Sequence, residues 1–129
     1  MEIKLYEGEK NWREKPFATL IENEVFWGEK EWREKAFLTI KDDKIYLGKK
    51  SWFEDPFATI KGNQVFKGSK EFWEDPLATI EGEKVYKGEK GWFDEEIATV
   101  KPADITGGAV AAVIILLMHE EFVAYKQKN

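Results

Sequence analysis

Residues 57–66, FATIKGNQVF, place two short apolar runs on either side of four polar residues. The first run ends at Ile60, the second begins at Val65, and the pair Gly62-Asn63 lies midway between them. β-Branched and aromatic runs separated by such a pair are typical of a β-hairpin with a two-residue turn. The segment therefore predicts antiparallel strands in which Ile60 faces Val65 and Thr59 faces Phe66.

The hairpin pattern recurs every twenty residues along the chain. Three columns of the repeat are aliphatic, aromatic and glycine, in that order. They hold Leu5, Val25, Ile45, Val65 and Val85; Tyr6, Phe26, Tyr46, Phe66 and Tyr86; and Gly8, Gly28, Gly48, Gly68 and Gly88. A strict period of this length indicates one supersecondary unit repeated in tandem.

The strand before each turn carries four further columns. They hold Phe17, Phe37, Phe57, Leu77 and Ile97; Ala18, Leu38, Ala58, Ala78 and Ala98; Thr19, Thr39, Thr59, Thr79 and Thr99; and Leu20, Ile40, Ile60, Ile80 and Val100. Apolar residues thus stand on both faces of the predicted strands. We expect ten strands in meander order, followed by a helix.

The predicted helix contains residues 109–118, AVAAVIILLM, which are apolar on every side. This run is shorter than the roughly 20 residues that cross a bilayer, so we expect no membrane span. A helix without a polar face has to be enclosed. A closed ten-stranded barrel has a backbone radius of roughly 10 Å, which leaves room for a helix about 5–6 Å in radius.

The sequence therefore predicts a mainly β fold: a closed, ten-stranded, antiparallel up-and-down barrel that encloses a C-terminal apolar α-helix. We expect one domain over residues 1–129, with repeats at 5–24, 25–44, 45–64, 65–84 and 85–101 and the core helix at about 104–122. Small and aliphatic columns should face inward, the Phe17 and Tyr6 columns outward, and residues after Glu120 should extend beyond the core. The expected core includes Ile60, Val65, Ile80, Val85, Val110, Val113, Ile114 and Leu117.

Charge and cysteine content exclude several classes of function. The net charge is −5, and both signs are interspersed, whereas a nucleic-acid binder needs a basic face. The chain has no cysteine, so it can form neither a disulfide nor a thiolate metal site. Its first residues lack the pattern of a secretory signal, and we expect a cytoplasmic monomer.

Candidate reactive side chains are few. His119 is the single histidine, and its neighbours Glu120 and Glu121 cannot converge with it on one metal ion from adjacent helix positions. Ser51 and Ser69 lie in connections, and neither is near a histidine in sequence, so a nucleophile–base pair has no support. We expect no catalytic residues, no metal site and no cofactor, and hence no enzymatic activity.

One column invites a functional interpretation. It holds Trp12, Trp32, Trp52, Phe72 and Trp92, all in the long connections between hairpins. Aromatic rings repeated around a barrel could stack on sugars or cations. They could equally cover the outward apolar columns as part of the fold.

The unit Ala78 to Gly88, ATIEGEKVYKG, resembles those of small bacterial proteins built from tandem hairpin repeats that end in an apolar helix. The resemblance covers nearly the whole chain and implies an architecture without implying an activity. The barrel around a helix is also similar to tubby-like domains, in architecture alone. The regular Lys/Glu-rich surface is typical of a designed or consensus sequence as well.

These observations favour a non-enzymatic structural or interaction scaffold, natural or designed. The alternative is a ligand-binding module that uses the Trp column, for carbohydrate or cell-envelope material.

Overall fold

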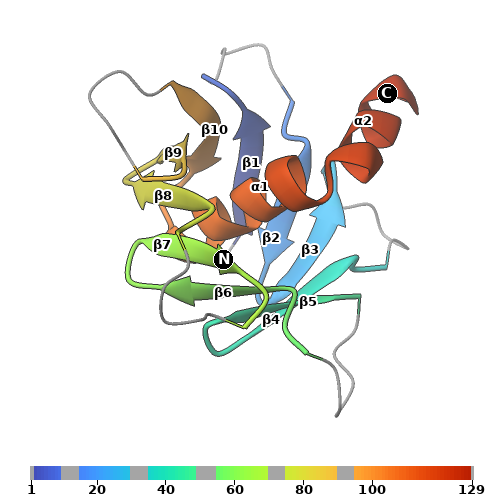
Figure 1. Ribbon diagram of the computed structural model, residues 1–129. Helices are drawn as coiled ribbons and strands as arrows, with labels where there is room; N and C mark the ends of the chain where they lie inside the picture. Colours follow the sequence, from blue (N-terminus) through green and yellow to red (C-terminus); the bar gives the residue numbers. More distant parts are fainter. Residues whose placement is uncertain are drawn as a thin grey trace.

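The computed structural model describes residues 2–9, 15–29, 35–48, 55–69, 75–89 and 95–128 (Figure 1). Within them it contains ten strands and two helices. The strands are β1 (Glu2–Glu7), β2 (Ala18–Ile21), β3 (Glu24–Trp27), β4 (Leu38–Lys41), β5 (Lys44–Leu47), β6 (Ala58–Lys61), β7 (Gln64–Lys67), β8 (Ala78–Glu81), β9 (Lys84–Lys87) and β10 (Glu96–Lys101). The helices are α1 (Ile105–Leu117) and α2 (His119–Lys128).

Each two-residue turn joins its strands in the predicted register. Across β6 and β7, Ile60 pairs with Val65, and the same offset recurs in β2–β3, β4–β5 and β8–β9. The first turn residue has a φ between 57° and 60°, which glycine adopts without steric cost at Gly62 and Gly82. Glu22 and Asp42 adopt a similar φ, so the hairpin imposes it even where the sequence offers no glycine.

The barrel closes through a hairpin that is split between the two ends of the chain. β1 pairs with β2 on one side and with β10 on the other, which completes a closed antiparallel ring. Val100 faces Leu5 in the register of the continuous hairpins. Thr99 Oγ1 donates a hydrogen bond of 2.7 Å to the Gly8 carbonyl, as the equivalent threonines do in the other four hairpins. The predicted ten-stranded barrel is therefore confirmed, and closure pairs the strand edges.

The two ends of the barrel differ in how they join the strands. The turn mouth is the end formed by the turns Glu22-Asn23, Asp42-Asp43, Gly62-Asn63 and Gly82-Glu83. The connection mouth is the opposite end, where the second strands of the hairpins lead into Gly8, Gly28, Gly48, Gly68 and Gly88. Because β10 ends at the turn mouth, α1 enters the barrel there and leaves at the connection mouth.

The core consists of α1 and the inward columns of the strands. Residues 107–114 of α1 are all buried, and so are the aliphatic and alanine columns around them. A Cβ on Gly108 would lie only 2.6 Å from Cγ1 of Ile80, so glycine is what allows the helix to approach β8. Of the expected core residues, the buried ones are Ile60, Val65, Ile80, Val85, Val110, Val113 and Ile114, and Leu117 is half-buried.

The prediction of a single helix over about 104–122 is wrong at its C-terminal end. α1 stops at Leu117, and α2 begins at His119 with a bend of 92° between them. Met118 has a φ of −117° and a ψ of 37°, which is not helical. The expected polar extension after Glu120 is also wrong, because Phe122 is only 1% exposed. A straight continuation would carry Phe122 out into solvent, whereas the bend lays it on the rim.

The prediction that the Phe17 column faces outward is wrong as well. Phe17 belongs to the core cluster, and Phe37, Phe57, Leu77 and Ile97 pack against that cluster. Side chains alternate between faces only within a regular pleated strand. The first four of these residues stand just before their strands begin, and Ile97 lies at an irregularity in β10, so alternation does not orient them.

Candidate functional site at the connection mouth

α2 follows α1 at the connection mouth, near the end of β3 (Figure 1). Its Phe122 belongs to the core cluster, and its Tyr125 packs against that cluster. Phe122 packs on Phe17, which stands just before β2, with ring centroids 4.8 Å apart and planes at 59°. Tilted aromatic pairs of this kind add to the energy of burial. The contact fixes α2 to the first continuous hairpin of the ring.

Aromatic stacking extends this contact along the rim. Trp27, the last residue of β3, stacks on Phe37 with centroids 4.2 Å apart and on Tyr125 of α2 with centroids 4.9 Å apart. The next residue, Gly28, has a φ of 60°, and a Cβ there would lie 2.5 Å from the Tyr125 hydroxyl oxygen. Glycine adopts this φ without steric cost and leaves the space that the Tyr125 hydroxyl occupies, whereas a larger residue would have to displace that hydroxyl.

A basic side chain completes the contact. Lys126 Nζ lies 3.1 Å from Oε2 of Glu7 and 4.4 Å from the centroid of the Phe122 ring. Both members of the ion pair are substantially exposed, so the pair contributes little to stability. The ion pair therefore helps to orient the C-terminal end of α2 but adds little to the energy that attaches the helix.

Sequence reasoning missed this region, although a signal was present. The last position of each second strand, at the connection mouth, holds Glu7, Trp27, Leu47, Lys67 and Lys87. The column is charged except at Trp27, where α2 packs, and at the next position, Leu47. A break in a repeat can therefore mark the place where a non-repeated element docks.

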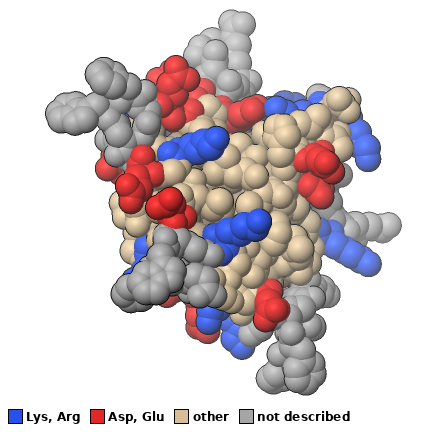
Figure 2. Space-filling model, in the orientation of Figure 1, with Lys and Arg blue, Asp and Glu red and all other residues tan. Residues whose placement is uncertain are grey.

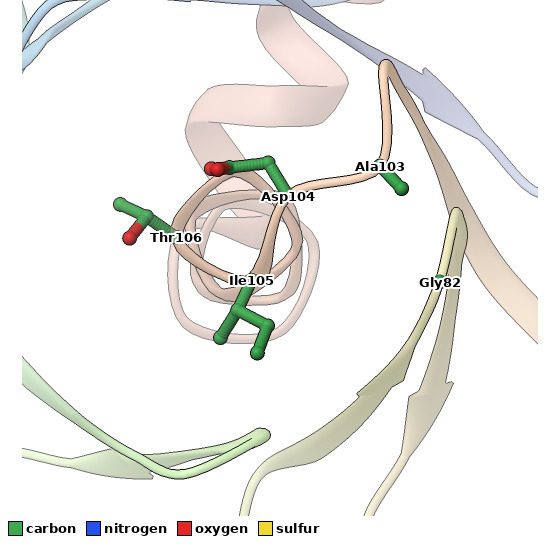
Figure 3. Close-up of a pocket in the computed structure, with 5 residues that line it drawn as sticks. All are labelled: Gly82, Ala103, Asp104, Ile105 and Thr106. Carbon is green, nitrogen blue, oxygen red and sulfur yellow. The ribbon is translucent and has the colours of Figure 1, made fainter.

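At the turn mouth the structure has an open pocket of about 500 Å³ beside the start of α1 (Figure 3). It is lined by Gly82, Ala103, Asp104, Ile105 and Thr106. The Asp104 carboxylate points away from Gly82 and accepts a 2.7 Å hydrogen bond from the Gly107 N–H, which caps the helix. Ile105 projects into the space and is 44% exposed. The carboxylate in this pocket is thus engaged by the helix itself.

Two ion pairs on the barrel surface join the β8–β9 hairpin to the neighbouring strand β10. Lys84 Nζ lies 3.2 Å from Oε1 of Glu96, and Lys101 Nζ lies 3.4 Å from Oε1 of Glu83. The hydrogen bond to Glu96 and its negative charge raise the pKa of Lys84 above the usual value. On the face drawn in Figure 2, acidic and basic side chains are interspersed around uncharged residues. This mixed pattern gives no single-signed surface on that face.

The residues singled out from the sequence lie partly outside the described ranges. The column Trp12, Trp32, Trp52, Phe72 and Trp92 lies outside the described residues. His119 is exposed at the start of α2. In the part of the chain that the structure describes, no group of three or more His, Cys, Asp or Glu side chains could hold a metal ion.

Neither helix in the described ranges is by itself both long and apolar enough to cross a membrane. α1 and α2 meet these criteria only when taken together across their 92° bend.

Comparisons with curated proteins and with solved structures find no match. A family model described as "6-fold beta flower protein" matches residues 2–115, which include all ten described strands and most of α1. The barrel of this chain closes with five hairpins, counting the split one, around its single enclosed helix. From the extent of the match, the chain belongs to the 6-fold beta flower protein family.

Proposed function

We propose that the chain is a repeat scaffold without catalytic function, which serves a structural or interaction role. The described interior offers little chemistry. Its buried polar residues are Thr19, Thr79 and Thr99, and each donates its hydroxyl hydrogen to a glycine carbonyl. Hydroxyl groups engaged in this way stabilise the rim and are not available as nucleophiles.

The observation that carries the proposal is the burial of the outward aromatic column. Tyr6, Phe26, Tyr46, Phe66 and Tyr86 are between 3% and 8% exposed, although they alternate with core residues and lie outside the core cluster. Both faces of the sheet are therefore buried. Aromatic residues in this repeat serve to build the fold, which supports a structural role for the Trp column as well.

The alternative, a ligand-binding module based on Trp12, Trp32, Trp52, Phe72 and Trp92, makes the opposite demand on those rings. Rings that bind carbohydrate have to stay accessible, whereas rings that cover the outer column have to be packed. The similarity to tubby-like barrels stays an architectural prediction, as do the cytoplasmic location and the monomeric state.

Truncation of single tryptophans distinguishes the two roles. In the scaffold, Trp32→Ala and Trp52→Ala should each lower the free energy of unfolding by roughly 2–4 kcal/mol, which overlaps the range of about 3–5 kcal/mol for a fully buried aromatic side chain. Leu47→Ala, at a side chain that is 49% exposed, is the control and should change it by less than about 0.5 kcal/mol. Denaturant unfolding measures all three.

The same variants test the alternative when unfolding is repeated with chitotriose or a soluble peptidoglycan fragment. The scaffold predicts no protection and no saturable change in tryptophan fluorescence. If the substitutions left the free energy of unfolding unchanged and the sugar caused a saturable fluorescence change, the scaffold proposal would be wrong and the ligand-binding function would be supported.

A further inference from the structure

The repeat places equivalent sets of residues around the connection mouth, and α2 occupies one of them. We call this set the first rim seat; it consists of Phe17, Trp27, Gly28 and Phe37. Phe122 packs on Phe17, and Tyr125 covers Trp27 and Gly28. At the edge of this seat, Glu7 forms an ion pair with Lys126.

A shift of twenty residues generates a second rim seat, which consists of Phe37, Leu47, Gly48 and Phe57. Its backbone repeats that of the first: the Gly48 N–H donates to the Phe37 carbonyl at 2.8 Å, as the Gly28 N–H donates to the Phe17 carbonyl at 2.7 Å. Thr39 donates to the Gly48 carbonyl in the same way as Thr19 donates to Gly28. The two seats are therefore built alike.

Within the described residues, α2 covers the first rim seat and does not cover the second. Leu47 is 49% exposed, and Phe37 and Phe57 are half-buried. A Cβ on Gly48 would have nothing within 4 Å, where the Tyr125 hydroxyl fills that space over Gly28. Phe37 belongs to both seats and is stacked on Trp27, so the exposed part of the second seat centres on Leu47 and Gly48, directly beside the interface with α2.

The apolar character of the rim does not extend around the ring. In the remaining three positions Lys67, Lys87 and Glu7 stand where the first two seats have Trp27 and Leu47. A charged side chain there disfavours burial under an apolar helix face. The second rim seat is thus specific to one hairpin and is not a general property of the repeat.

We propose that the second rim seat binds an amphipathic helix of a partner protein that presents two large apolar side chains three residues apart. This inference rests on the interaction role proposed above. The occupied seat defines the chemistry, because α2 meets the first seat with Phe122 and Tyr125 at that spacing. Residues three apart lie on one side of a helix.

The chain's own α2 does not supply this helix. It follows α1 after a single residue, Met118, and its apolar side is already used, since Phe122 is 1% exposed. The same holds for α2 of a second copy. In the second seat Trp27 takes the place that Glu7 has in the first, so the partner helix needs no basic residue like Lys126.

The test uses a peptide with the sequence of residues 119–128, HEEFVAYKQK, extended by an alanine-rich segment so that it forms a helix. It is titrated into the isotope-labelled full chain and followed by amide chemical shifts. We expect saturable shifts at Leu47 and Gly48, with none at Gly28. A peptide with alanine at both aromatic positions should lose at least tenfold in affinity.

Leu47→Lys is the decisive variant, because the ring itself carries lysine at 67 and 87. It should keep its thermal unfolding midpoint and lose at least tenfold in peptide affinity, whereas Lys67→Ala should keep both. Absence of saturable shifts, shifts centred on Gly28, or unchanged affinity in Leu47→Lys would each overturn the proposal. Such a failure is distinguishable from failure of the scaffold, which is decided by the stability of the Trp32 and Trp52 variants.

Discussion

α1 and α2 follow each other directly in the chain, yet the barrel holds them by different means. α1 is apolar on every side, and its residues 107–114 are buried within the ring of strands. α2 has acidic residues in its first turn and basic residues in its last, and it rests on the rim by Phe122 and Tyr125. A helix without a polar face has to be enclosed, whereas one with a single apolar side needs only a surface to rest on. One helix is therefore part of the core, and the other is attached to it.

Removal of residues 103–129 tests the role of α1 and should have the largest effect on stability. The apolar side chains of α1 contribute on the order of 10 kcal/mol of gross burial energy at ~25 cal/mol per Å², comparable with the net stability of a domain. We expect loss of the native state, seen as loss of cooperative thermal unfolding by circular dichroism. A monomer with a transition near that of the full chain would contradict the enclosed role of α1.

Ile114→Asp tests the same point within the full chain. Ile114 is 0% exposed, and a carboxylate there has no polar partner among the aliphatic residues of the core. We expect loss of cooperative unfolding here too, whereas Ile105→Asp, at an exposed position on the same helix, should unfold cooperatively.

Phe122→Ala tests the attachment of α2 and should have an intermediate effect. The side chain is 1% exposed against Phe17, and truncation of a buried phenylalanine costs about 3–5 kcal/mol, less if α2 detaches as a unit. The barrel should stay folded, while amides of residues 120–128 exchange faster with solvent. Val123→Ala is the control on the same helix and should leave exchange nearly unchanged. Equal exchange in both variants would mean that Phe122 does not hold α2.

Gly108→Ala tests how closely α1 approaches the strands. Alanine favours a helix by about 1 kcal/mol over glycine, so the substitution should stabilise the chain if space were available. A Cβ there would lie 2.6 Å and 2.7 Å from the two γ carbons of Ile80. We therefore expect a net destabilisation of about 1–3 kcal/mol, as for other overpacked cores.

A second substitution tests whether the clash with Ile80 causes the destabilisation by Gly108→Ala. In an Ile80→Ala background both γ carbons are absent, and Gly108→Ala should then become neutral or stabilising in denaturant unfolding. If Gly108→Ala destabilised both backgrounds equally, the close approach to Ile80 would not be the cause.

The barrel could be predicted because its signal is repeated and local. The turn at Gly62-Asn63 fixes which residues face each other, and the twenty-residue period extends that register to the other hairpins. The enclosure of α1 followed from its composition alone. The hairpins and the enclosed helix can thus be predicted without knowing which residues distant in sequence contact each other.

The arrangement of α2 could not be predicted because it depends on such knowledge. The break at Met118 has neither glycine nor proline to announce it. In the first rim seat, Phe17 just before β2 and Trp27 at the end of β3 meet residues about a hundred positions later, and their alignment follows only from the 92° bend. The Trp column, the one candidate site predicted from sequence, lies outside the described residues and stays a prediction.

Loss of the contact between Lys126 and Glu7 should lower the free energy of unfolding least of all the changes considered. The two charges lie 3.1 Å apart at an exposed edge, where such pairs contribute at most about 0.5 kcal/mol and are screened by salt. Exchange of the charges in Glu7→Lys with Lys126→Glu should restore most of the small loss that each single variant shows. Lys128→Glu, on the same helix, is the control for a general change in the charge of α2.

Salt dependence is the sharper measurement of this pair. The coupling energy from the double-mutant cycle should fall toward zero between low salt and 1 M NaCl, where the screening length is about 3 Å. The contact of Lys126 with the Phe122 ring, 4.4 Å from nitrogen to centroid, should persist in the Glu7→Gln variant and keep α2 seated. A coupling that stayed above about 1 kcal/mol in 1 M NaCl would show that the ion pair is a main attachment of α2, and the distinction between an enclosed helix and one held by its aromatic side would fail.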